Sequence, residues 1–154
     1  MKTRFLCSNH LAWLENRPDL AMVTSLQCSD KAQILWEEGE CTHALAFAGS
    51  GFEAAQIVLK KHSGSVSERV NLYTASCVLF ANILYSAQQP VMARTVIAAA
   101  IADLEDLMVL NEARREILHG CRSLLSLGDS ASDPLDISDW KPFNSTGTAL
   151  LLLH

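Results

Sequence analysis

The stretch between Arg69 and Arg94 constrains the fold most, because it contains no charged side chain and is long enough to cross a bilayer as a helix. It also carries asparagine, threonine, serine and glutamine side chains, which are costly to place in hydrocarbon. On a helical projection its apolar residues fall on two faces, as in a helix packed between neighbours. One face holds Val66, Val70, Tyr73, Cys77, Phe80 and Leu84, and the other holds Leu72, Leu79 and Ile83. We therefore expect a buried central helix over residues 66–87, outside any membrane.

Helix start and stop signals recur along the rest of the chain. Pro18 and Pro90 suit the first turn of a helix, where the missing N–H costs nothing. Ser65 and Glu68 form a capping-box pattern, and Gly39 is placed to end a helix. No segment keeps the alternation of a strand. We expect an all-α fold, an antiparallel helical bundle or a short helical array, with helices near residues 4–16, 18–38, 41–48, 50–62, 66–87 and 90–127.

Two of these boundaries depend on single residues. Gly49 is expected to stop one helix, and Ser50 with Glu53 has the spacing of a capping box that opens the next. A new helix capped by Asn111 would place the arginines at 114–115 at its positive end, which the helix dipole disfavours. The sequence therefore predicts one long or kinked helix from residue 90 to about 127.

The chain changes character after the last predicted helix. Residues 1–128 are expected to form a single helical domain. Residues 129–154 read as an irregular acidic tail that ends in a run of leucines at 150–153. Because a free leucine run is unfavourable in water, we expect it to dock on this subunit or on another, and a homodimer is possible.

The composition excludes several classes of protein. Hydrophobic residues make up 49% of the 154 residues and charged residues 19%, which rules out intrinsic disorder. The net charge of -5 argues against nucleic-acid binding, which needs a basic face. Five cysteines, with no CxxC pair and no signal peptide, favour a reduced, cytoplasmic protein. No nucleophile-and-base signature occurs, so we expect no enzyme activity and no cofactor.

Small and apolar residues recur at identical offsets in two windows. The first window holds Cys28, Ala32, Leu35, Ala44, Ala48 and Gly51, and the second holds Cys77, Ala81, Leu84, Ala93, Ile97 and Ala100. This pattern resembles the tetratricopeptide repeat, whose helix pairs use small residues at matching positions. The resemblance covers about half the chain. It departs from the family in the cysteine at the aromatic first position, in the missing closing proline, and in a separation longer than about 34 residues.

The resemblance implies an adaptor or chaperone that binds a peptide or helix of another protein on a concave face. By position, that face would present Gln33, Trp36, Glu37, Val78, Asn82 and Tyr85. Tryptophan and tyrosine are frequent anchors of protein interfaces. The neighbouring acidic residues would select a basic partner.

Two Glu-x-x-His patterns support an alternative hypothesis. They are Glu40 with His43 and Glu116 with His119. Pairs of this kind, with further carboxylates, build metal sites in four-helix bundles. Glu116 and His119 are expected to point away from the apolar face of their helix, and no carboxylate partners are evident. The alternative is therefore a small helical-bundle protein that binds a metal or another ligand through one such pair.

Overall fold

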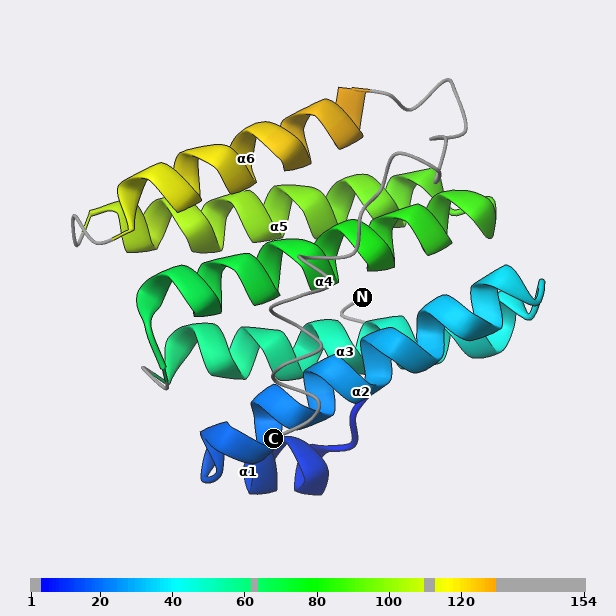
Figure 1. The fold of residues 1–154 in the computed structure, drawn as a ribbon. Coiled ribbons are helices and arrows are strands. Elements are labelled where there is room, and N and C mark those ends of the chain that lie inside the picture. Colours follow the sequence, from blue (N-terminus) through cyan, green and yellow to red (C-terminus); the bar gives the residue numbers. More distant parts are fainter. Residues whose placement is uncertain (1–3, 62–63, 110–112, 130–154) are drawn as a thin grey trace.

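A computed structural model describes residues 4–61, 64–109 and 113–129, and it contains six α-helices and no strand in these residues. This confirms the expected all-α fold (Figure 1). The helices are α1 (Ser8–Glu15), α2 (Pro18–Glu37), α3 (Cys41–Lys60), α4 (Val66–Ser86), α5 (Pro90–Met108) and α6 (Arg114–Asp129).

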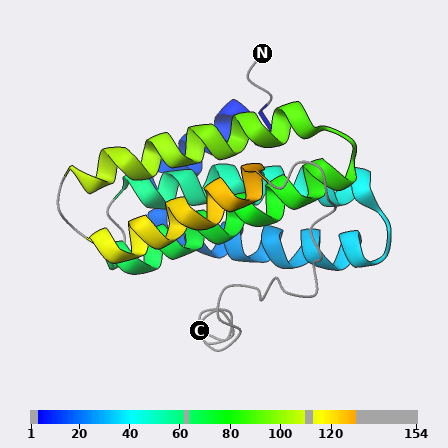
Figure 2. The same cartoon turned by 90° about the horizontal axis from the view of Figure 1, so that it is seen from above.

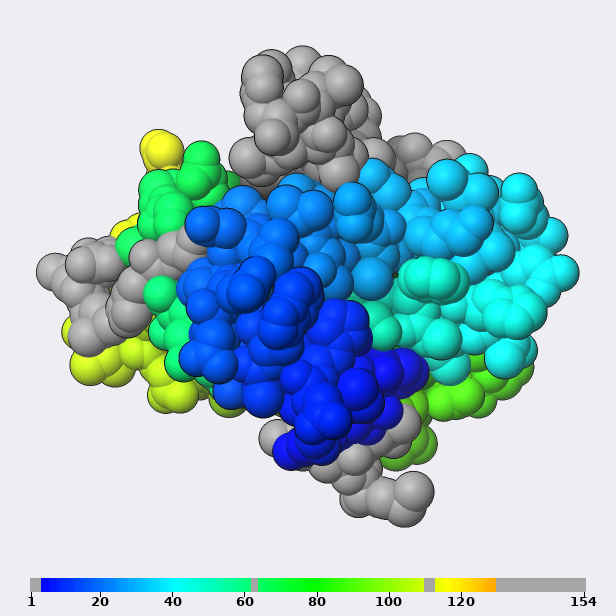
Figure 3. All heavy atoms as spheres, turned by 90° about the horizontal axis from the view of Figure 1, so that it is seen from below, coloured from blue at the N-terminus to red at the C-terminus, as the bar shows by residue number. Residues whose placement is uncertain are grey.

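From α2 onward, each helix packs antiparallel against the next one along the chain (Figure 1). Helix α4 contacts α2, α3, α5 and α6, and thus occupies the centre of the array. Helices α2, α4 and α6 form one layer, while α3 and α5 belong to the other (Figure 2). The short α1 packs on α2 and α3, and together with α2 it covers the face seen in Figure 3.

The central helix buries both of its predicted apolar faces. Tyr73 and Cys77 are fully buried on one face, and Ile83 is fully buried on the other. Because α4 has neighbours on nearly every side, it needs no charged face to meet water. The described part of the chain contains no helix long and apolar enough to cross a membrane.

The predicted helix boundaries are confirmed where they depend on local chemistry. Ser65 accepts a hydrogen bond from the Glu68 amide, and the Glu68 carboxylate accepts one from the Ser65 amide, both at 3.2 Å. Pro18 and Pro90 begin α2 and α5. Gly39 follows α2 with a φ of +82°, a left-handed conformation that glycine adopts without strain.

The predicted break at Gly49 is wrong, because α3 continues through this residue to Lys60. The Ser50 hydroxyl donates to the Ala46 carbonyl within the same helix, at 2.9 Å, instead of capping a new one. The glycines serve close packing. A Cβ atom at Gly51 would lie 3.2 Å from the Ser25 carbonyl oxygen of α2, so only a residue without a side chain fits easily at this crossing.

The predicted long helix over residues 90–127 is also wrong. Helix α5 ends at Met108, and α6 folds back to pack on both α4 and α5. The arginines at the start of α6 do not prevent this, because Arg115 is almost fully exposed and its guanidinium lies 4.0 Å from the Glu116 carboxylate. Water and a neighbouring acid therefore offset the unfavourable helix dipole.

The outer ends of the first and last helices lie within a few residues of their predicted positions. Helix α1 begins at Ser8, since residues 4–7 form a bent segment that is not helical and is hydrogen-bonded to Glu53 of α3. Helix α6 runs to Asp129, close to its predicted end. Residues 130–154, which include the predicted acidic tail and leucine run, lie outside the described residues.

Candidate binding groove

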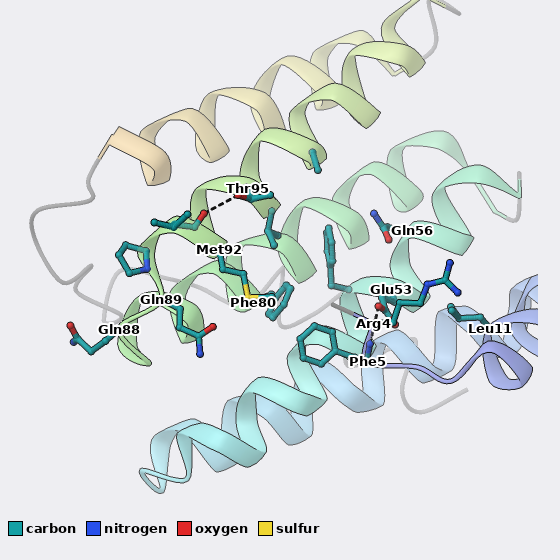
Figure 4. Close-up of a pocket in the computed structure, with 15 residues that line it drawn as sticks. Arg4, Phe5, Leu11, Glu53, Gln56, Phe80, Gln88, Gln89, Met92 and Thr95 are labelled. Atoms are coloured by element: carbon teal, nitrogen blue, oxygen red, sulfur yellow. Dashed lines mark hydrogen bonds between the residues drawn. The ribbon is translucent and has the colours of Figure 1, made fainter. Parts of the chain in front are cut away.

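A groove lies between α3 and α5, which make no contact with each other, and α4 forms its floor. The N-terminal segment and α1 bound one end, and the turn between α4 and α5 bounds the other (Figure 4). The groove encloses about 940 Å³. Its lining residues are Arg4, Phe5, Leu11, Phe52, Glu53, Gln56, Phe80, Gln88, Gln89, Pro90, Val91, Met92, Thr95, Val96 and Ala99.

Aromatic rings make up the floor of the groove. Phe80 of α4 meets Phe5 edge-to-face, with ring centroids 5.3 Å apart, and Phe52 of α3 lies 5.7 Å from Phe80. Figure 4 shows the side chains of Phe5 and Phe80 beside one another. Phe52 also stacks on the buried Tyr73 behind it, at 5.3 Å. Because these rings support one another, the floor is a preformed apolar surface.

The Glu53 carboxylate holds the N-terminal segment at one end of the groove. One carboxylate oxygen accepts the Phe5 amide at 3.0 Å, and the other accepts the Leu6 amide at 2.7 Å. Hydrogen bonds to an ionised acceptor are stronger than neutral ones. The predicted capping role of Glu53 is therefore wrong, since its side chain binds a distant main-chain segment.

The α5 wall of the groove is apolar. Val91 is 69% exposed, and Met92 and Val96 are partly buried beside it. The Thr95 hydroxyl donates a hydrogen bond to the Val91 carbonyl at 2.9 Å. Its proton is therefore not available to an occupant of the groove. This wall offers contacts to an apolar occupant and few competing hydrogen-bond donors.

A hydrogen bond beneath the groove fixes α5 against α4. The Tyr73 hydroxyl donates to the Asp103 carboxylate at 2.6 Å. Burial raises the pKa of Tyr73, and the hydrogen bond to Asp103 and its negative charge raise it further. Tyr73 therefore stays protonated and keeps donating throughout the physiological pH range.

The structure brings together the ends of α2 and α4, as the predicted binding face requires. The Trp36 indole N–H donates to the Ser86 hydroxyl at 3.2 Å. Gln33 donates to the Glu37 carboxylate at 2.7 Å along the exposed side of α2. Trp36 is partly buried, and its hydrogen bond to Ser86 already engages the indole N–H within the chain.

The predicted α4 residues of this face differ in exposure. Asn82 is buried, whereas Val78 and Tyr85 are partly buried. Among the described residues, the Tyr85 hydroxyl and the Gln33 side-chain oxygen are buried atoms without a hydrogen-bond partner. The six residues therefore do not form one open surface, although Trp36 and Tyr85 lie on helices that meet.

The Glu-x-x-His pairs lie near the surface, with Glu116 partly buried on α6. Glu40 and His43 are 3.2 Å apart at the start of α3, both largely exposed, and His119 is exposed on α6. No group of three or more histidine, cysteine, aspartate or glutamate side chains converges within the described ranges.

The sequence analysis does not predict the groove, although the apolar residues of α5 contain part of the information that defines it. Helix α5 buries Ala93, Ile97 and Leu104 against the core, yet it also carries apolar residues beside that stripe. Val91 and Met92 belong to this second stripe. An apolar surface wider than one packing face indicates a second contact, which is here the groove.

No family model, curated protein or solved structure matches this chain. The two sequence windows lie on the helix pairs α2–α3 and α4–α5. The resemblance to tetratricopeptide repeats therefore stays a prediction.

Proposed function

We propose that this protein is an interaction module that binds an amphipathic helix of a partner protein in the groove between α3 and α5, without catalysis. The observation that carries the proposal is the gap between these two helices, whose floor is formed by the aromatic rings of Phe5, Phe52 and Phe80. A third helix laid in this gap would contact α3, α4 and α5 together, which is how helix-in-groove complexes bury an apolar face.

The dimensions of the groove suit a short helical segment. Residues 90–99 of α5 line it, a length of about 15 Å at 1.5 Å per residue. About three turns of a partner helix would fit along this wall. Such a segment presents apolar side chains at spacings of three and four residues, which would meet Phe80, Met92 and Val96.

The N-terminal segment illustrates the contacts that the groove makes. Phe5 places an aromatic ring on Phe80, and Glu53 accepts the neighbouring amides. A partner helix can place an aromatic or aliphatic anchor on the same floor, while Glu53 keeps its two main-chain partners in the N-terminal segment. The net charge of -5 favours a partner with basic residues beside its apolar stripe.

The predicted face of Trp36 and Tyr85 is less suited to be the main contact. The Trp36 indole is already bonded to Ser86, and Asn82 is buried. Self-association through the leucine run at 150–153 and a cytoplasmic location stay predictions.

The volume of the groove also supports a second candidate, a small apolar ligand. Pockets for such ligands span about 300–1,000 Å³ and combine apolar walls with a few polar groups. The value of about 940 Å³ lies within this range. This candidate replaces the Glu-x-x-His hypothesis as the ligand-binding alternative.

A site-specific photo-crosslinker in living cells of the native host tests the proposal. A benzophenone side chain at Val91 lies in the groove, while the same group at Val23 of α2, also exposed, serves as the matched control. We expect a discrete crosslinked protein from residue 91 and none from residue 23. A Val96→Glu substitution should abolish the crosslink, because it places a charge in the apolar wall.

Native mass spectrometry of the same protein distinguishes the two candidates. A small molecule that remains bound in the native spectrum, and is lost with Val96→Glu, would favour the ligand. Equal crosslinking from residues 91 and 23 would contradict a groove-specific partner.

A further inference from the structure

Helix α6 exposes apolar and basic residues in a single stripe. Arg115, Leu118, Arg122 and Leu125 follow one another at spacings of three and four residues, which places them on one face of the helix. Leu118 is 45% exposed and Leu125 is 55% exposed, about 100° around the helix from the buried Ile117 and Leu124. We call this stripe the Arg/Leu face.

The Arg/Leu face is unusual for its position. Among the described residues no helix follows α6, and the outer side of a terminal helix in an array is normally polar. The face is also basic in a chain whose net charge is -5. Within the described ranges, Arg122 forms no ion pair, and Arg115 approaches only Glu116, at 4.0 Å. The face thus combines exposed leucines with cations that can bind carboxylates.

Residues 133–143, which follow α6 closely in the sequence, have the complementary composition. They read as successive triplets, Asp-Pro-Leu, Asp-Ile-Ser and Asp-Trp-Lys, followed by Pro-Phe. Each triplet begins with an aspartate and continues with an apolar residue. In a polyproline II conformation, with three residues per turn, the three aspartates form one edge and the residues Pro134, Ile137, Trp140 and Phe143 form an adjacent one.

The distance between successive triplets of residues 133–143 is similar to the distance between equivalent residues on the Arg/Leu face. Successive triplets are about 9 Å apart in polyproline II. Arg115 and Arg122 are one heptad apart, as are Leu118 and Leu125, which corresponds to about 10.5 Å along a helix. The three residues 130–132 span up to about 10 Å, enough to turn around the end of α6.

We propose that segment 133–143 folds back along α6 of the same chain and covers the Arg/Leu face. An antiparallel path that begins near Asp129 places Asp136 beside Arg122 and Asp139 beside Arg115. Ile137 and Trp140 then lie against the exposed leucines. This surface is separate from the groove, so the inference does not depend on the proposed function.

The indole signal of Trp140 in a nitrogen-15 correlation spectrum of the full chain tests this inference. The chain has three tryptophans, and a Trp140→Phe sample assigns the signal. A synthetic peptide of residues 130–145 gives the position of the free indole. We expect the full-chain signal to differ clearly from the peptide signal.

Charge reversal then identifies the surface. The double variant Arg115→Glu with Arg122→Glu should move the Trp140 signal toward the peptide position, with about a tenfold lower ratio of docked to free segment. Leu118→Ser with Leu125→Ser should act in the same direction. The control, Lys31→Glu with Arg94→Glu, makes the same change in net charge at exposed positions outside α6 and should leave the signal in place.

A reciprocal exchange makes the test specific for the ion pairs. Asp136→Arg with Asp139→Arg, added to the two arginine reversals, should return the signal toward its original position. A Trp140 signal at the peptide position in the unmodified chain would overturn the proposal, as would insensitivity to both α6 variants. A shift that disappears on dilution, with a dimer at high concentration, would also overturn it, because a second copy would then cover the face.

Discussion

The ring of Phe5 lies so close to Gly49 that a Cβ atom at residue 49 would overlap it. This contact seats the N-terminal segment at the end of the groove, with the Phe5 and Leu6 amides on Glu53. Gly49→Ala should therefore expel the segment while leaving α3 intact, because alanine favours a helix. Hydrogen exchange of the Phe5 and Leu6 amides should accelerate by at least about tenfold.

Removal of the ring provides the control for this prediction. In a Phe5→Ala background the space above residue 49 is free, so Gly49→Ala should stabilise the protein by about 0.5–1 kcal/mol in urea unfolding. Unchanged exchange of the two amides in Gly49→Ala alone would contradict the contact.

Substitution by alanine should have different effects on the unfolding free energy at Gly120 and at Gly128 of α6. A Cβ atom at Gly120 would lie 2.7 Å from the Thr74 hydroxyl oxygen of α4, whereas one at Gly128 would lie 3.8 Å from Ile97. Gly120→Ala should cost about 1–3 kcal/mol of unfolding free energy, because α6 must move away from α4. Gly128→Ala makes only an ordinary contact and should be neutral or slightly stabilising.

Thermal unfolding of the two variants measures this difference. The Thr74→Ala background removes the obstructing side chain, and Gly120→Ala should then lose most of its cost. Equal effects at residues 120 and 128 in the original background would show that α6 does not approach α4 this closely.

The two tyrosines of α4 make a matched pair for hydrogen bonding. Tyr73 donates to the Asp103 carboxylate at 2.6 Å, while the Tyr85 hydroxyl is buried without a partner among the described residues. Tyr73→Phe should destabilise the protein by about 1.5–3 kcal/mol, because it leaves a carboxylate without its donor. Tyr85→Phe removes an unsatisfied group and should be neutral or stabilising by up to about 1 kcal/mol.

Urea unfolding at neutral pH checks both values. A large loss for Tyr85→Phe would indicate that its hydroxyl has a partner and would return attention to the predicted face around Trp36. A negligible effect of Tyr73→Phe would mean that Asp103 does not tie α5 to α4.

The sequence predicted those parts of the fold that depend on neighbouring residues. The capping box of Ser65 and Glu68 and the proline starts of α2 and α5 are local chemistry, and they are confirmed. The burial of α4 was also predictable, because two apolar faces on one helix require neighbours on both sides.

The wrong boundaries have a common physical reason. Gly49 and Gly51 have the appearance of helix breakers, yet tertiary packing retains them inside α3, where Phe5 and α2 need the space. The contact between α6 and α4 through Gly120 similarly outweighs the unfavourable arginines at the start of α6. Such effects depend on residues far away in the sequence, which local patterns do not report.

The groove is the least predictable feature, because it is defined by the absence of contact between two helices. Its residues come from the N-terminal segment, α1, α3, α4 and α5. Only their arrangement around Phe80 makes them one surface. The aromatic residues Trp36 and Tyr85 are easier to identify in the sequence than this arrangement, and they direct the prediction to the other face.

Stability should fall at alkaline pH, because α4 buries two weak acids. Burial raises the pKa of the Cys77 thiol and of the Tyr73 hydroxyl above their ordinary values of 9.0 and 10.0, and the negative charge of Asp103 adds to both. Above pH 9 the unfolded chain loses these protons while the folded chain retains them. The unfolded state then binds fewer protons, so the unfolding free energy decreases as pH rises. Each group contributes up to about 1.4 kcal/mol per pH unit.

Urea unfolding from pH 7.5 to pH 11 measures this slope. The stabilisation should be fully present below pH 9 and be lost progressively above it. Cys77→Ala lowers stability at every pH through the cavity that it leaves, so the slope rather than the absolute value is compared. That variant should show a shallower decline than the unmodified chain, and Tyr73→Phe should reduce the decline above pH 10. A stability that stays constant up to pH 11 would contradict the burial of these two groups.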